Sequence, residues 1–121
     1  MRLSEAIQLG AMMTPQAFRT LFKGDGACAL GAAMLAVGVA PEQAGRSLRK
    51  RWPWAFAVSV NCPSCGRSHL VCQVIVHLND DHRWTREKIG AWVAGIEPSQ
   101  PPDDRPGGTL SAVCAASSTK V

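Results

Sequence analysis

The spacing of apolar residues predicts that the first half of the chain is helical. Ser4 is suited to capping a helix whose apolar positions in residues 6–12 lie on one face. Pro15 suits the first position of a second helix, in which Phe18 and Phe22 recur at helical spacing. We therefore expect two short helices before the glycine-rich break at residues 24–26.

Two more helices are expected before residue 52. Residues 27–37 are apolar on all sides, which is typical of a helix buried among others. Another helix opens at Pro41, and basic side chains near its end complement the exposed carbonyls of the last turn. These basic residues are Arg46, Arg49, Lys50 and Arg51. They form either a solvated helix end or a nucleic-acid patch with Trp52 and Trp54 as stacking surfaces, and a core edge is the favoured interpretation of the tryptophans.

After residue 55 the period of the pattern changes from 3.6 to 2. Residues 55–61 are predicted to form a strand, residues 62–66 a turn and residues 69–78 a returning strand. Thr85 is a plausible N-cap for a last helix over residues 86–94, which Gly95 would end. The predicted class is α+β, with a helical N-terminal half packed on a β-hairpin and one short C-terminal helix.

Length and composition indicate one small globular domain over residues 1–97. Residues 98–121 are rich in Pro, Gly, Ser and Asp and are expected to be a disordered tail, in which Cys114 is a passive thiol. The formal charge of +4 permits nucleic acid as a partner without requiring it. We see no export signal and no apolar run long enough for a bilayer, so we expect a cytoplasmic protein with reduced thiols and no membrane partner.

The strongest chemical signal is a set of two cysteines and two histidines. Cys62 and Cys65, followed by His77 and His82, have the spacing C-x2-C-x11-H-x4-H, within one residue of the spacing of two-Cys two-His zinc sites. Zinc suits this set because a tetrahedral d10 ion accepts thiolate and neutral imidazole without geometric penalty. The spacing predicts that these four residues bind zinc.

The predicted strand conflicts with this metal site. An extended chain rises about 3.3 Å per residue, which would place His77 on the order of 25 Å from the cysteines. Either the strand is interrupted, or another ligand such as His69 or Cys28 completes the site. The histidines could instead serve the fold through hydrogen bonds. The same alternation places Cys72 on the apolar face, as a core residue.

The segment HLNDDHRWTREKIGAWV, residues 77–93, resembles small proteins encoded by bacteriophages and prophages, with a pattern like H-L-N-D-x-H-x-W-[ST]-R-E-x-I-A-x-W. LSEAIQLGAM near the start and CALGAA at residues 28–33 are also similar to that group, so the resemblance covers roughly residues 3–97. Gly90 stands where the pattern has alanine. The resemblance implies a bacterial or phage origin and a shared fold, without an established activity.

Three functions compete on these observations. The first is a small zinc-stabilised protein that binds a host protein or nucleic acid, and the lack of an assembled catalytic set favours it over an enzyme. The second is a metal-dependent nuclease, in which a strand ending at His77 is followed by Asp80, Asp81 and His82. That site lacks a further ligand on the following helix. The third is thiol catalysis by Cys28 at a helix N-terminus.

Overall fold

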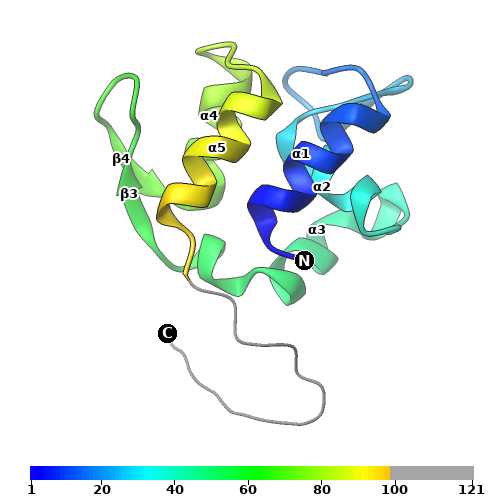
Figure 1. The fold of residues 1–121 in the computed structure, drawn as a ribbon, viewed down its shortest axis with the longest axis horizontal. Helices are drawn as coiled ribbons and strands as arrows, with labels where there is room; N and C mark the ends of the chain where they lie inside the picture. Colours follow the sequence, from blue (N-terminus) through cyan, green and yellow to red (C-terminus); the bar gives the residue numbers. More distant parts are fainter. Residues whose placement is uncertain (99–121) are drawn as a thin grey trace, which may run out of the picture.

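A computed structural model describes residues 1–98, and the predicted tail with Cys114 lies outside the described residues. The α-helices are α1 (Leu3–Met13), α2 (Ala29–Ala36), α3 (Ala44–Arg51), α4 (Val71–Asp80) and α5 (Arg86–Ile96). Short 3-10 helices are η1 (Pro41–Gln43) and η2 (Pro53–Phe56). The strands are β1 (Phe22–Lys23), β2 (Gly26–Ala27), β3 (Ser59–Asn61) and β4 (Ser68–Leu70), which form two antiparallel pairs. The predicted α+β class is confirmed (Figure 1).

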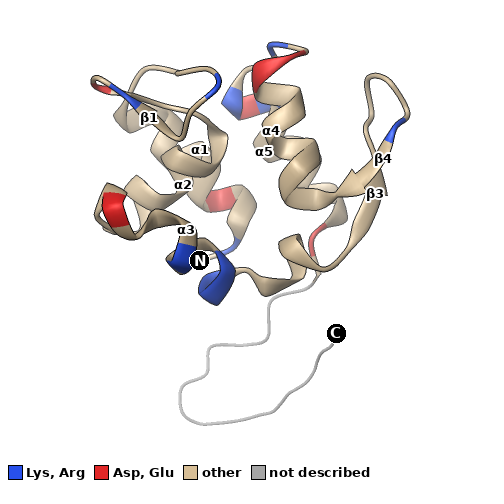
Figure 2. Ribbon diagram, turned by 180° about the vertical axis from the view of Figure 1, so that it is seen from behind, with Lys and Arg blue, Asp and Glu red and all other residues tan. Residues whose placement is uncertain are grey.

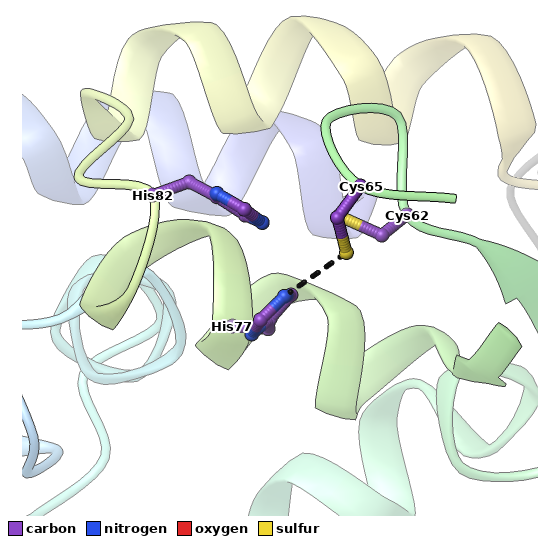
Figure 3. Close-up of side chains that lie close together, drawn as sticks. All are labelled: Cys62, Cys65, His77 and His82. Atoms are coloured by element: carbon purple, nitrogen blue, oxygen red, sulfur yellow. Dashed lines mark hydrogen bonds between the residues drawn. The ribbon is translucent and has the colours of Figure 1, made fainter. Parts of the chain in front are cut away.

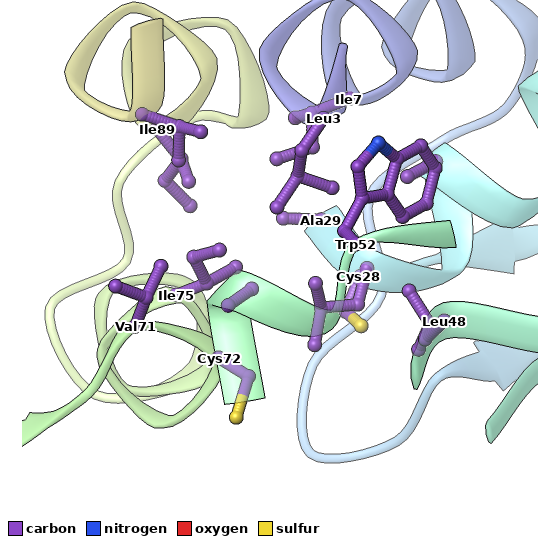
Figure 4. Packing of buried hydrophobic residues seen from close by; sticks show 14 of the residues in the cluster. Leu3, Ile7, Cys28, Ala29, Leu48, Trp52, Val71, Cys72, Ile75 and Ile89 are labelled. Atoms are coloured by element: carbon purple, nitrogen blue, oxygen red, sulfur yellow. The ribbon is translucent and has the colours of Figure 1, made fainter. Parts of the chain in front are cut away.

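The helices share one core that extends from α1 to α5. Helix α1 packs against α2 and α5, while α4 contacts both α2 and α5. Figure 4 shows buried side chains of α1, α2, α4 and α5 converging with Leu48 of α3 and Trp52. At Gly10 of α1 a Cβ atom would lie 1.9 Å from the carbonyl oxygen of Ala32, so a glycine is needed for α1 and α2 to approach this closely.

The first helix begins earlier than the sequence pattern indicates. Arg2 is the N-cap of α1, and the predicted cap Ser4 is a buried residue of the first turn. The backbone N–H and the hydroxyl of Ser4 donate to the carboxylate of Glu97, which follows α5. This carboxylate complements the positive end of the α1 dipole and joins the first helix to the last.

The predicted helix at Pro15 is wrong, because residues 14–28 form a loop and the β1–β2 hairpin. The guanidinium of Arg86, from α5, donates to backbone carbonyls in this segment, including those of Pro15 and Ala27. The side chain of Asn79, from α4, donates to the carbonyl of Ala17 and accepts from the backbone N–H of Ala29. These long-range hydrogen bonds satisfy backbone groups that a helix would have satisfied locally.

The helices predicted around residues 27–37 and from Pro41 are confirmed with shorter bounds. Helix α2 covers Ala29–Ala36, and Gly38 lies just beyond it with a φ of +75°, as expected for a residue that ends a helix. The segment opening at Pro41 begins as η1 and continues as α3. Trp52 is 5% exposed and its indole N–H donates to the carbonyl of Met1, which confirms its interpretation as a core residue.

The second half departs most from the predicted strands. The strand expected from residue 55 starts only at Ser59, after η2. The returning strand ends at Leu70, and the remainder of residues 69–78 belongs to α4. The apolar residues of this segment fit a period of 2, but the fully buried ones lie at helical spacing. The fully buried apolar residues of α4 are Val71, Val74, Ile75 and Leu78.

The last helix agrees with its predicted start. The Thr85 hydroxyl accepts a hydrogen bond from the backbone N–H of Lys88, which confirms Thr85 as the N-cap of α5. The helix continues to Ile96, so Gly95 does not end it. At Gly90 a Cβ atom would come within 2.6 Å of the Gln8 side chain of α1. Among residues 1–98, none of the helices is long and apolar enough to cross a membrane.

Candidate metal centre

The loop between β3 and β4 forms a tight turn that presents two thiols. The backbone N–H of Gly66 donates to the carbonyl of Cys62, and the N–H of Cys62 donates to the carbonyl of Arg67. Gly66 has a φ of +79°, a conformation that glycine adopts without steric cost and that reverses the chain directly after Cys65. The turn therefore places Cys62, which is buried, beside the exposed Cys65.

The environment of Cys62 favours its thiolate. Burial acts to raise the pKa of this thiol, but hydrogen bonds from the backbone of Cys65, Ser64 and Gly66 and from the Cys65 side chain together outweigh burial and hold the pKa below its ordinary value. A thiolate is the form of cysteine that binds metal ions. The turn thus prepares one sulfur for coordination through its own hydrogen bonds.

Helix α4 brings His77 to the same place. A helix rises 1.5 Å per residue, so the six steps from Val71 to His77 span about 9 Å, compared with about 20 Å for a strand. The helix packs back along the hairpin, and Nε2 of His77 lies 3.4 Å from Sγ of Cys65. The conflict between spacing and distance disappears because the predicted strand is interrupted at Leu70.

His82 completes the cluster from the turn after α4. Its ring lies 4.4 Å from the ring of His77, measured between centroids, in an edge-to-face arrangement. Its Nε2 atom is buried, and within residues 1–98 no hydrogen-bond partner reaches it. A buried imidazole nitrogen without a partner is costly unless another ligand binds it. His82 therefore has a free donor atom directed into the cluster (Figure 3).

The four residues form a group that could hold a metal ion. One donor atom from each of Cys62, Cys65, His77 and His82 lies within 4.8 Å of the others (Figure 3). In a tetrahedral zinc site, metal bonds of about 2.0–2.3 Å separate the donors by roughly 3.3–3.8 Å. The observed spread exceeds this value by about 1 Å, which rotations of the exposed Cys65 side chain and of the half-buried histidine rings can remove. Donor types and geometry thus fit a tetrahedral ion.

Asp81 supports His77 from outside the four-residue group. Asp81 is the C-cap of α4, and its Oδ2 lies 2.7 Å from Nδ1 of His77, which is four residues and about one helical turn earlier. A carboxylate that accepts a hydrogen bond from Nδ1–H orients the ring and leaves the lone pair of Nε2 free to bind a metal ion. The sequence interpretation missed this role because Asp81 was assigned to a turn after a strand. An i, i+4 spacing from His77 would have indicated it once residues 71–80 were read as a helix.

We expect Asp81→Ala to weaken metal binding by about 10–100-fold, the usual loss when a histidine ligand loses its carboxylate partner. Competition with a chromogenic zinc indicator measures this affinity. Asp25→Ala removes a different exposed carboxylate, on the turn between β1 and β2, and should change the affinity less than twofold. Equal affinities for Asp81→Ala and Asp25→Ala would contradict the role of Asp81.

The alternative ligands lie apart from this group. His69 is exposed on β4, with its ring centroid 6.5 Å from that of His77. Cys28 is buried at the N-cap of α2, and burial raises the pKa of its thiol, which opposes the predicted nucleophile. Cys72 belongs to the core, as predicted, and burial raises the pKa of its thiol as well. The strand-turn-helix basis of the nuclease hypothesis is also wrong, because His77 lies within α4.

The predicted basic residues lie on α3, outside the group of Cys62, Cys65, His77 and His82. Arg46, Arg49, Lys50 and Arg51 are all exposed. The guanidinium of Arg49 lies 5.0 Å from the centroid of the Phe56 ring, a cation–π contact that occupies one side of that arginine. Their contact with nucleic acid stays a prediction, since a solvated helix end has the same arrangement.

Comparisons with protein-family models, with curated proteins and with solved structures found no match.

Proposed function

We propose that Cys62, Cys65, His77 and His82 bind one zinc ion, and that the protein is a small zinc-stabilised binding protein of a phage or prophage. The observation that carries this proposal is the convergence of four donor atoms within 4.8 Å. Two sulfurs and two imidazole nitrogens in a tetrahedral arrangement are the set that zinc prefers. The resemblance of residues 77–93 supports the phage or prophage context.

The ion would have a structural role at this position. Four protein donors fill a tetrahedral shell and leave no open position for substrate, as in structural rather than catalytic zinc sites. The cysteines come from the β3–β4 loop and the histidines from the end of α4 and the turn after it. Zinc would therefore hold the small hairpin against the helical core and fix the turn between α4 and α5.

The test is metal analysis of the purified full chain. We expect one zinc per chain, and cobalt substitution should give the absorption of a tetrahedral ion with thiolate ligands. Titration of the thiols should show two cysteines that become reactive only after chelation. A chain that contains no stoichiometric metal and gains none from buffered zinc would overturn the proposal.

We propose that the protein binds a host protein or a nucleic acid in the bacterial cytoplasm. Bacterial lysate passed over immobilised zinc-loaded protein should yield a partner that Cys62→Ser protein does not retain. Phosphodiester cleavage with added Mg²⁺, Mn²⁺ or Zn²⁺ tests the alternative of a nuclease-like enzyme. We expect no cleavage, because the filled tetrahedral shell has no place for an attacking water.

A further inference from the structure

A basic pocket lies between the turn that joins α4 to α5 and the segment at residues 14–28. It has a volume of about 590 Å³ and is formed by the loop before β1, the β1–β2 hairpin and the turn after α4. Figure 2 shows cationic segments in all three places. The charged residues of its lining are Arg19, Lys23 and Arg83 against the single carboxylate of Asp25.

We propose that this pocket binds phosphate groups, either those of a single nucleic-acid strand or those of a free nucleotide. The inference rests on the proposed binding function and names the chemistry of its partner. The volume lies within the range of about 300–1,000 Å³ for ligand pockets, so a nucleotide unit fits. Each planar guanidinium can donate two parallel hydrogen bonds to a pair of phosphate oxygens, and the lysine adds a point charge.

Arg83 occupies a backbone conformation that usually favours glycine, and its side chain is held by an aromatic ring. It follows the end of α4 with a φ of +57°, and the N–H of Trp84 donates back to the carbonyl of Leu78. Glycine is the residue that this helix-ending conformation favours. The arginine side chain instead lies over the Phe18 ring, with its guanidinium carbon 4.2 Å from the ring centroid. Stacking orders the guanidinium and leaves its outer face and edges for a ligand.

Arg19 is ordered through its backbone and remains open at its side chain. It has a φ of +69°, and its N–H donates to the carboxylate of Asp80 at 2.8 Å. Its guanidinium lies 3.9 Å from Asp81, and 73% of its side chain is exposed. Within residues 1–98, Arg19 and Arg83 are the non-glycine residues with positive φ, and both line this pocket. Such backbone conformations often mark binding sites.

The pocket borders the candidate metal centre. Asp81 contacts Arg19 on one side and His77 on the other. Arg83 directly follows His82 in the chain. An ion bound by the two histidines would therefore fix the turn that carries Arg83. It would also fix the carboxylate of Asp81, which contacts Arg19. The basic residues of α3 lack such a setting, because the pocket beside Arg49 is otherwise mostly apolar, with Leu48, Phe56 and Val76.

The test is fluorescence anisotropy of a labelled single-stranded oligonucleotide with the zinc-loaded full chain, at low and at moderate salt. We expect binding that weakens as salt rises, as phosphate contacts require. Arg83→Asn and Arg19→Asn should each weaken binding about 10-fold and lower the salt slope by about 0.7. Asparagine tolerates the left-handed backbone, so these variants should fold. Arg46→Gln removes a cation from the competing patch on α3, and it should change binding less than twofold because the pocket, and not α3, is proposed to hold the phosphates.

Competition separates the two sources of phosphate. ATP that displaces the oligonucleotide at micromolar concentration identifies a nucleotide site, whereas displacement only by longer unlabelled strands identifies a nucleic-acid site. The proposal is overturned if neither the oligonucleotide nor ATP binds. It is also overturned if polyglutamate displaces the labelled oligonucleotide as well as unlabelled oligonucleotide does, or if Arg46→Gln weakens binding as much as Arg83→Asn. Zinc content is measured on the same samples, so a zinc-loaded protein that fails to bind refutes the pocket and leaves the metal centre intact.

Discussion

Replacing Cys62 with serine should abolish stoichiometric zinc binding and lower the melting temperature by about 10–30 °C. Serine keeps the size of the side chain but supplies no thiolate at neutral pH, so the site loses its most buried donor. A ligand present at 100 to 1,000 times its dissociation constant stabilises the folded state by about 2.7–4.1 kcal/mol. In a domain of this size each kcal/mol corresponds to roughly 4–8 °C.

Cys72→Ser is the matched control for this variant. Cys72 is also buried, but it lies in the core and outside the group of four donors. We expect it to keep one zinc per chain, with a smaller loss of stability. Thermal melts followed by circular dichroism, with and without a chelator, make the comparison. Chelation should bring wild-type protein close to the melting temperature of Cys62→Ser and leave that variant unchanged. A zinc-loaded Cys62→Ser protein would refute the ligand role of this cysteine.

Arg86→Met should lower the free energy of unfolding by about 3–5 kcal/mol without changing the zinc content. The side chain is buried, and its guanidinium donates to one carbonyl in the last turn of α1, that of Ala11, and to three in the segment before α2, those of Thr14, Pro15 and Ala27. Burial lowers the pKa of the guanidinium, which remains charged at neutral pH. Methionine fills similar space but donates nothing, so several partly buried carbonyls lose their partner.

Urea denaturation measures this loss, and Arg83→Asn is its control. Arg83 lies three residues before Arg86 but is exposed, so its replacement should cost less than about 1 kcal/mol. Metal content should stay at one zinc per chain in both variants, because Arg86 contacts the segment at residues 14–28 and not the turn at residues 62–66. If Arg86→Met were no less stable than Arg83→Asn, the loop at residues 14–28 would have to be held by other contacts.

The candidate ligand residues were accessible from the sequence, whereas their supporting partners were not. The two-Cys two-His spacing and the turn composition of residues 62–66 are local features, and both predicted the group that the fold brings together. The supporting contacts of Asp81, Asn79 and Arg86 depend on where α4 and α5 lie. Asn79 and Arg86 act on residues about 50 to 75 positions away, which no local pattern encodes.

The sequence by itself determined the α+β class, the buried helix α2, the cap at Thr85 and the candidate donors, because each depends on local chemistry or short spacing. Only the tertiary structure decided between strand and helix after Leu70. The β-branched run there fits both periods, and burial against α2 and α5 selects the helical one. Tertiary contacts likewise decided the loop at residues 14–28, where buried polar side chains of α4 and α5 supply hydrogen bonds that replace those of a helix.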